Sequence, residues 1–177
     1  KFTNMLQGQR ELSSVGRLLL SELAPLVDAH QGVIYQVVND DGETGLRLLS
    51  AYADDGETPH PARLRVGEGL VGQCAADRRL MLIGDIPDNI VPIRSALLRS
   101  SPRNIIILPV LFEGQVKAVI ELGAVGAFTT LQTTFLEQLT SSIGIVLNSI
   151  EATMQTEELL TQSQTLAAEL QSQQGEL

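Results

Sequence analysis

The residues from Gly67 to Gly72 read Gly-Glu-Gly-Leu-Val-Gly and match the G-x-G-x-x-G pattern of dinucleotide-binding loops. In such loops the glycines bring a helix N-terminus up to a pyrophosphate, and a later acid, here Asp85, binds a ribose hydroxyl. However, Arg63 and Arg65 stand where a buried parallel strand should be apolar, and no second set of alternating strands and helices follows. The sequence therefore favours a structural turn that lets a helix pack close to a sheet. The glycines of this turn are Gly67, Gly69 and Gly72.

Other side chains that could do chemistry are few and scattered. The single cysteine, Cys74, cannot form an internal disulfide, and we expect a small buried residue there in preference to a reactive thiol. His30 and His60 both fall in predicted loops, which disfavours haem ligation. No Ser/His/Asp set, pair of catalytic carboxylates or cluster of metal ligands is visible in the sequence. The sequence thus predicts no catalytic residue, no metal site and no cofactor.

Acidic residues outnumber basic ones by 21 to 12, which gives a net charge of −9. No lysine or arginine follows Lys117, whereas seven glutamates do. This balance argues against a nucleic-acid partner and against an anionic membrane surface. The sequence also has no run of about 18 apolar residues, so we expect a cytosolic domain without direct membrane insertion. Because the chain begins without methionine and ends inside a predicted helix, we expect it to be part of a longer protein.

Hydrophobic periodicity divides the chain before Leu131 into a helix, a series of strands and a short second helix. Residues 12–27 have helical spacing after a possible cap at Ser13 or Ser14, and Pro25 should kink or restart that helix. A bulge is expected at Pro109, because proline has no N–H for a strand ladder. The expected strands are Gly32–Asn39, Leu46–Tyr52, Ala62–Val66, Leu80–Gly84, Asn104–Phe112 and Val116–Leu122, and the short helix is Leu70–Arg78.

The segment from Leu131 to Leu177 has no proline, only two glycines and a recurring apolar stripe, and is predicted to form one long helix. It would span roughly 70 Å, whereas a domain built from the preceding residues has an expected radius of gyration of only about 14 Å. The helix must therefore extend beyond the domain. Its apolar stripe favours a second copy as the partner, and a register break between Ile150 and Leu159 is where a coiled coil tolerates rewinding. The stripe consists of Leu139, Ile143, Val146, Ile150, Leu159, Leu166, Leu170 and Leu177.

Four short motifs are Val66–Gln73 (VGEGLVGQ), Asp85–Pro87 (DIP), Pro109–Val110 and Val119–Leu122 (VIEL). Together they resemble the GAF domain, a small-molecule sensing and dimerisation module. The resemblance covers residues 12–150 and implies an α+β fold, with a central antiparallel sheet of five or six strands, helices packed on one side, and flanking N- and C-terminal signalling helices. From residue 102 onward the chain is similar to GAF domains of bacterial hybrid sensor histidine kinases, which lie between a HAMP segment and the phosphorylating core.

The resemblance also implies a ligand cavity between the sheet and the segment that follows Asp85. Glu121 stands among apolar neighbours in a strand, where a buried carboxylate needs a partner, either a ligand amine or an arginine at the sheet edge. Arg94 could neutralise an anionic ligand or remain solvated, and Asp85 could face the cavity or cap the next segment. The candidate cavity residues are Tyr35, Asp85, Ile93, Arg94, Ser95, Leu98 and Glu121.

Several ligands and activities of this fold are disfavoured by the residues present. Cyclic-nucleotide binders carry an Asn-Lys…Phe…Asp-Glu motif, which this chain lacks. Bilin-binding members attach the pigment through a cysteine typically followed by histidine, whereas Cys74 is followed by two alanines. The sulfoxide reductases of this fold need more than one cysteine. The resemblance leaves open which ligand binds and whether any does.

These features predict the sensor module of a histidine kinase in the inner membrane. Residues 1–11 would continue a HAMP-like segment, residues 12–150 form the GAF domain, and residues 151–177 form the signalling helix. The expected partners are a second copy in a parallel homodimer, the kinase core in the same chain, an unidentified small molecule and, through the parent chain, a response regulator. The fragment itself is expected to perform no catalysis. The alternatives are a ligand-free structural dimerisation spacer and a small-molecule enzyme of the same fold.

Overall fold

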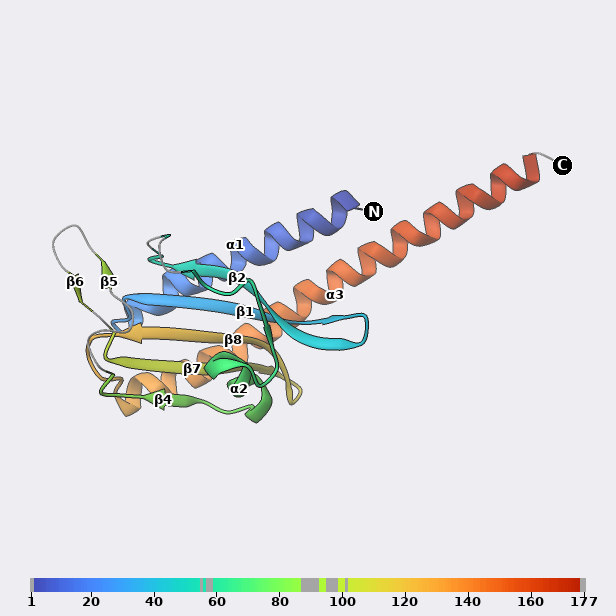
Figure 1. Cartoon of the computed structure of the whole chain (residues 1–177). Helices are drawn as coiled ribbons and strands as arrows, with labels where there is room; N and C mark the ends of the chain where they lie inside the picture. Colours follow the sequence, from blue (N-terminus) through green and yellow to red (C-terminus); the bar gives the residue numbers. More distant parts are fainter. Residues whose placement is uncertain are drawn as a thin grey trace.

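The computed structural model describes residues 2–54, 56, 59–86, 93–94, 99–100 and 102–175, with backbone alone at 2–6, 93–94 and 99–100. Its centre is a six-stranded sheet in the order β3-β2-β1-β8-β7-β4 (Figure 1). All pairings of neighbouring strands in this sheet are antiparallel. The strands are β1 (Gln31–Asp40), β2 (Glu43–Tyr52), β3 (Arg63–Arg65), β4 (Met81–Ile83), β7 (Asn104–Phe112) and β8 (Gln115–Ala124), and β5 (Ile93–Arg94) pairs separately with β6 (Arg99–Ser100).

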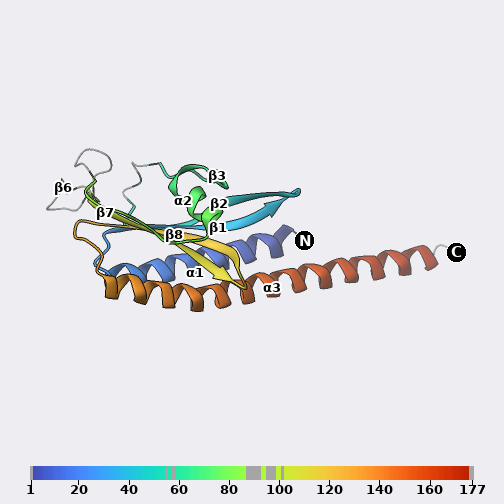
Figure 2. The ribbon, with the colours of Figure 1, turned by 90° about the horizontal axis from the view of Figure 1, so that it is seen from below.

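Two long helices cover one face of the sheet, and a short helix lies on the other (Figure 2). The long ones are α1 (Phe2–Leu26) and α3 (Thr130–Gly175), and the short one is α2 (Gly69–Asp77). The two long helices run antiparallel, so both chain ends emerge on the same side of the domain (Figure 1). With 46 residues, α3 is roughly 70 Å long and continues well beyond the sheet. The predicted α+β fold class is confirmed.

Three local predictions need correction or refinement. The first helix begins at Phe2, so Ser13 and Ser14 lie in its interior and cap nothing. Pro25 lies in the last turn of α1, which ends one residue later; a proline inside a helix removes a backbone hydrogen bond and so commonly marks its end. The irregularity in the β7–β8 ladder falls between Val110 and Leu111, one residue after Pro109.

Each face of the sheet carries its own apolar cluster. On the α1/α3 face, alternate residues of β1, β7 and β8 pack against the helices, as Ile34, Leu108 and Ile120 do. Gly144 brings α3 so close to β7 that a Cβ at this position would overlap the carbonyl oxygen of Leu111. On the α2 face, the cluster consists of Val33, Tyr35, Leu46, Val71, Cys74, Ala75, Ile107 and Val119. None of the described helices is both long and apolar enough to cross a lipid bilayer.

Candidate functional site

The glycine-rich turn between β3 and α2 is held by its own backbone. Gly67 and Gly69 have φ angles of +89° and +64°, in the left-handed region that favours glycine. The Arg65 N–H donates a 2.8 Å hydrogen bond to the Glu68 carboxylate, and a Cβ on Gly72 would come within 2.5 Å of the Arg65 carbonyl oxygen. Because β3 pairs antiparallel with β2, the strand before the loop is not the parallel strand of a dinucleotide site. The geometry is that of a turn which packs α2 close to the sheet.

A cavity of about 260 Å³ lies on the α2 face, between the sheet and the loop that follows β2. We call it the Glu121 cavity. Its sheet side is formed by Val33, Ile105, Glu121 and Gly123, from β1, β7 and β8. The rest of the lining includes Tyr52 at the end of β2, Asp54 and His60 in the loop after β2, and Pro102 before β7. The described lining combines apolar residues with Gln31 and Glu121 on the sheet and with an aspartate and a histidine in the loop.

Glu121 is the unusual group of this cavity. Its cross-strand neighbours are Val33 on β1 and Ile107 on β7, both apolar. No described residue forms an ion pair or hydrogen bond with its carboxylate, and burial raises the pKa of Glu121 above its ordinary value. On the same face, the Tyr35 hydroxyl donates a 2.8 Å hydrogen bond to the carbonyl oxygen of Pro61, which joins β1 to the loop. Burial, and secondly the charge of Glu121, raise the pKa of Tyr35.

The remaining residues predicted for the cavity are not brought together here. Asp85 is exposed, has a left-handed φ of +54° and is absent from the described lining of the Glu121 cavity. Ile93 and Arg94 form β5, for which the structure describes the backbone. Ser95 and Leu98 lie outside the described residues. Sequence reasoning missed the contribution of the loop after β2, because His60 between two prolines resembles an ordinary surface loop.

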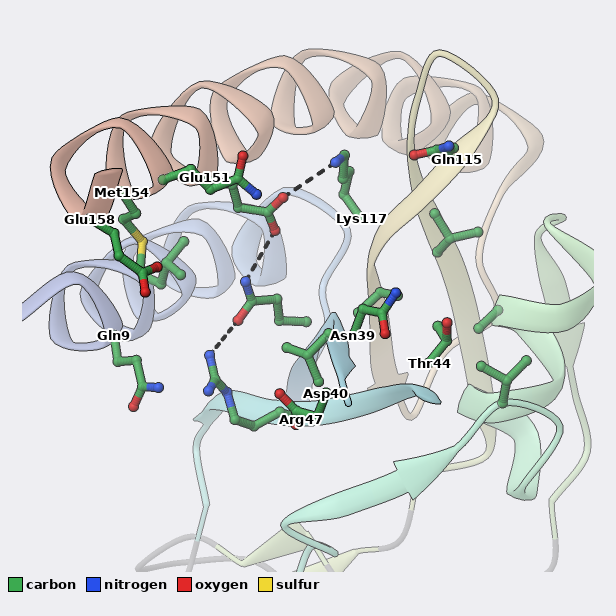
Figure 3. A pocket seen from close by; sticks show the side chains of 18 of the residues that line it. Gln9, Asn39, Asp40, Thr44, Arg47, Gln115, Lys117, Glu151, Met154 and Glu158 are labelled. Carbon is green, nitrogen blue, oxygen red and sulfur yellow. Dashed lines mark hydrogen bonds and ion pairs between the residues drawn. The ribbon is translucent and has the colours of Figure 1, made fainter. Parts of the chain in front are cut away.

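A second, larger hollow lies where the sheet divides. The β1–β8 ladder ends at the pair Gln36 and Ala118; beyond it, β1 stays with β2 while β8 stays with β7. A groove of about 1110 Å³ that is open to solvent lies in the gap between the two hairpins, beside α1 and α3, and we call it the α3 groove. Polar side chains from five elements, α1, β1, β2, β8 and α3, line it, among them Gln9, Asn39 and Glu158 (Figure 3).

Four side chains in the α3 groove form a continuous network, which we call the anchor network (Figure 3). Arg47 of β2 donates to the Gln36 side-chain oxygen at 2.7 Å, and the Gln36 amide donates to Glu151 of α3 at 3.1 Å. The other carboxylate oxygen of Glu151 pairs with Lys117 of β8 at 3.3 Å. Burial, and secondly Arg63, lower the pKa of Arg47. The network therefore joins three strands to α3 where the helix leaves the sheet.

The GAF domain family model matches residues 9–148, which is most of the chain. The chain belongs to the GAF domain family. A search of the curated proteins gives no significant match. The match to the GAF family model covers all six strands of the sheet and the three strand residues of the anchor network, Gln36, Arg47 and Lys117. It ends just before Glu151.

Solved structures share the fold of this GAF domain. The GAF domain of a phosphoenolpyruvate-protein phosphotransferase from Coxiella burnetii has a TM-score of 0.64 at 16% identity, over 85% of this chain and 96% of its own. The second GAF domain of DevS from Mycobacterium smegmatis has a TM-score of 0.60 at 18% identity, over 81% of this chain and 97% of its own. The type II free methionine-R-sulfoxide reductase from Thermoplasma acidophilum has a TM-score of 0.59 at 16% identity, over 80% of this chain and 96% of its own. This fold serves domains of larger proteins and an enzyme alike.

The single cysteine of this GAF domain is built into the core. Cys74 of α2 is fully buried, and its thiol donates to the carbonyl oxygen of Arg79 at 3.4 Å. Burial, and secondly the charge of Asp77, raise the pKa of Cys74 to about 12. Since the thiolate is the nucleophile, this thiol is nearly inert at neutral pH. The described residues also contain no group of acidic, histidine or cysteine side chains that could hold a metal ion.

The predicted apolar stripe of the GAF domain's long helix divides between two environments. Ile143 is buried in the domain's own core, and Leu139 and Ile150 pack against that core, together with Leu136 and Leu147, which the stripe left out. Val146 is half exposed. The distal members Leu159, Leu166 and Leu170 are exposed, and Leu177 lies outside the described residues. The two parts are therefore not two registers of one seam, because they face different surroundings.

A different stripe runs along the exposed side of α3. Ile145, Ala152, Leu159 and Leu166 follow one another at seven-residue steps. All four are exposed, and the exposed fractions of Ile145, Leu159 and Leu166 are 61%, 65% and 60%. We call this set the outer seam. Sequence reasoning missed Ile145, because it assigned the neighbouring Ile143 and Val146 to the seam instead.

Proposed function

We propose that this GAF domain is the sensory module of a two-component sensor histidine kinase, and that it passes a small-molecule or upstream signal along α3 to a kinase core in the same chain. The observation that carries this proposal is the division of α3. Its first half packs on the sheet, and its second half continues beyond the domain with apolar side chains exposed (Figure 1). Such a helix can carry a displacement of the domain to whatever follows it.

The anchor network supports a physical route for the signal. Glu121 in the cavity and Lys117 in the groove lie four residues apart on β8, about 13 Å. On β1, Val33 lines the cavity and Gln36 lies three residues further along. A ligand that shifts β1 against β8 would thereby act on the two contacts of Glu151. The direction in which α3 leaves the domain would change with them.

The outer seam supports the expected parallel homodimer. The outer seam supplies one apolar position of each heptad, part of the pattern by which two helices wind around each other, and in a parallel pair each seam residue meets its own counterpart. An isolated helix beyond the domain is also poorly stable without such a partner. A second copy would remove Leu159 and Leu166 from water together.

The kinase context rests on the motifs in the second half of the chain. The segments Leu108–Leu122 and Glu157–Gln164 are similar to GAF domains of hybrid sensor histidine kinases. In this setting a HAMP-like segment of an inner-membrane protein precedes α1, and the output is transfer of phosphate to a response regulator. Because α1 and α3 are antiparallel neighbours, an upstream helix entering through α1 would lie beside the output helix.

Light scattering tests the dimer. The chain of 19.1 kDa is expected to have twice that mass in solution, and a chain cut after Thr156 should be largely monomeric. This cut retains Glu151 and Met154, which contact the domain, and removes Leu159 and Leu166. A monomer before and after the cut would refute the dimer. The parent protein should form acid-labile phosphohistidine from ATP, and failure to do so would refute the kinase context.

An enzyme of the same fold is the second candidate, because the solved structures that share the fold include a free methionine-R-sulfoxide reductase. The buried Cys74 speaks against thiol chemistry of that kind in this chain. Turnover of free methionine sulfoxide that is lost in Cys74→Ala would favour the enzyme over the sensor.

A further inference from the structure

The Glu121 cavity has a chemical character that narrows its ligand. Its volume of about 260 Å³ is just below the range of about 300–1,000 Å³ that holds drug-sized molecules, so a ligand of metabolite size is expected. Val33, Ile105 and Pro102 offer it an apolar wall. No lysine or arginine is among the described residues that line the cavity, whereas two carboxylates, Glu121 and Asp54, are.

The two carboxylates are not equivalent. Asp54 already accepts a 3.1 Å hydrogen bond from the Gly56 N–H, so its carboxylate has a partner in the protein. Glu121 is largely buried between apolar cross-strand neighbours, and no described residue donates to it. A buried carboxylate without a partner is costly, and sheets rarely retain one at a position where valine or isoleucine would pack. Its retention here is explained if the partner arrives with the ligand.

We propose that the Glu121 cavity binds a small organic cation, a primary amine with a short apolar body, whose ammonium group pairs with the Glu121 carboxylate. The ammonium supplies the hydrogen-bond donors that the carboxylate lacks, and the apolar body lies against Val33 and Ile105. Asp54 adds negative potential at the loop side. This inference names the ligand class of the sensor and in that sense rests on the proposed function.

The pairing makes binding dependent on pH with a definite sign. Only the ionised carboxylate attracts an ammonium, and the pKa of Glu121 in the free protein is raised by burial. Affinity should therefore rise with pH through that raised pKa and then level off, and binding should release a proton on the acidic side. Among the residues that the structure describes, the other titratable groups at the cavity are Tyr35 on β1, Tyr52 on β2 and, in the loop, Asp54 and His60. The profile is also recorded in His60→Gln, which separates the contribution of Glu121 from that of the loop histidine.

The test uses three four-carbon probes on the 177-residue chain: n-butylammonium, n-butanol and butyrate. Titration calorimetry and amide chemical shifts at pH 8 should show saturable binding of n-butylammonium, with n-butanol at least about tenfold weaker and no saturable binding of butyrate. Equal binding of n-butanol, or no saturation by n-butylammonium, would overturn the proposal. The light-scattering and phosphorylation experiments do not involve this cavity, so the ligand class and the signalling role can fail separately.

Two variants locate the binding. Glu121→Gln keeps the shape of the side chain and removes its charge, and it should weaken n-butylammonium about tenfold or more and remove the part of the pH dependence that persists in His60→Gln. The matched control is Glu43→Gln, since Glu43 is an exposed strand glutamate, and it should leave binding unchanged. If Glu121→Gln binds n-butylammonium as the unmodified chain does, the cation lies elsewhere and the proposal is wrong.

Discussion

Two glutamates near opposite ends of the β1–β8 strand pair have contrasting surroundings. At the α3 groove, Glu151 accepts a hydrogen bond from Gln36 and pairs with Lys117. In the Glu121 cavity, the carboxylate has apolar neighbours across the sheet and no partner among the described residues. A partnered carboxylate fastens elements together, whereas an unpartnered one costs stability and is available to a ligand. The end of the sheet at the α3 groove therefore holds the output helix in place, whereas the end at the Glu121 cavity is suited to bind a ligand.

The largest effect is expected where the carboxylate is partnered. Glu151→Ala leaves the nearly buried Gln36 amide and the Lys117 ammonium without their acceptor, and should lower the free energy of unfolding by about 1–3 kcal/mol. The matched control is Glu158→Ala, an exposed glutamate of the same helix that also lines the groove, with an expected change within about 0.5 kcal/mol. Urea denaturation measures both. Equal losses would remove the special role of Glu151.

The sequence could predict the sheet, because apolar runs of strand length, alternating or continuous and bounded by turn residues, are typical of β-strands. It could also predict Glu121 as a candidate, since a lone charge in the run Val119–Leu122 is visible without any structure. The anchor network could not be predicted in this way. Gln36 and Glu151 are 115 residues apart, and isolated polar residues in an acidic chain give no sign of which ones meet.

The helix seam shows a second limit of the sequence. The sequence of α3 shows a single apolar stripe, but the first half of the helix packs on the sheet of its own domain and the second half exposes its apolar side chains. Ile143 and Ile145 are two residues apart, and one is buried in the core while the other is 61% exposed. Only the position of the sheet decides which of them faces inward.

A smaller loss is expected at the far end of the anchor network. Arg47→Ala removes one donor from the Gln36 oxygen, and because Arg47 is partly exposed the loss should be about 0.5–1.5 kcal/mol. The matched control is Arg63→Ala, which breaks a surface pair with Asp40 whose side chains are 56% and 64% exposed. Such pairs contribute little, so the control should unfold almost as the unmodified chain does. A larger loss at Arg63 than at Arg47 would argue against the network.

The smallest effect should have the opposite sign. In the folded chain the pKa of Glu121 lies above its ordinary value of 4.5, so the folded state holds this proton more tightly than the unfolded state. The penalty is absent below about pH 4.5, grows as the pH rises toward the raised pKa, and is complete above it. Glu121→Gln should therefore raise the thermal midpoint relative to the unmodified chain at pH 8, with a shrinking difference toward pH 4. A destabilised Glu121→Gln at pH 8 would mean that the carboxylate has a partner.

The central claim is that the second half of α3 is an output helix that pairs in parallel with a second copy. Disulfide cross-linking of Leu159→Cys tests it most directly, with Leu160→Cys as the control, because the two leucines are 65% and 58% exposed on different sides of the helix. The native Cys74 is buried and does not interfere. Mild oxidation should give a covalent dimer rapidly from Leu159→Cys and slowly from Leu160→Cys. Equal rates, or no cross-link at Leu159→Cys, would contradict the account.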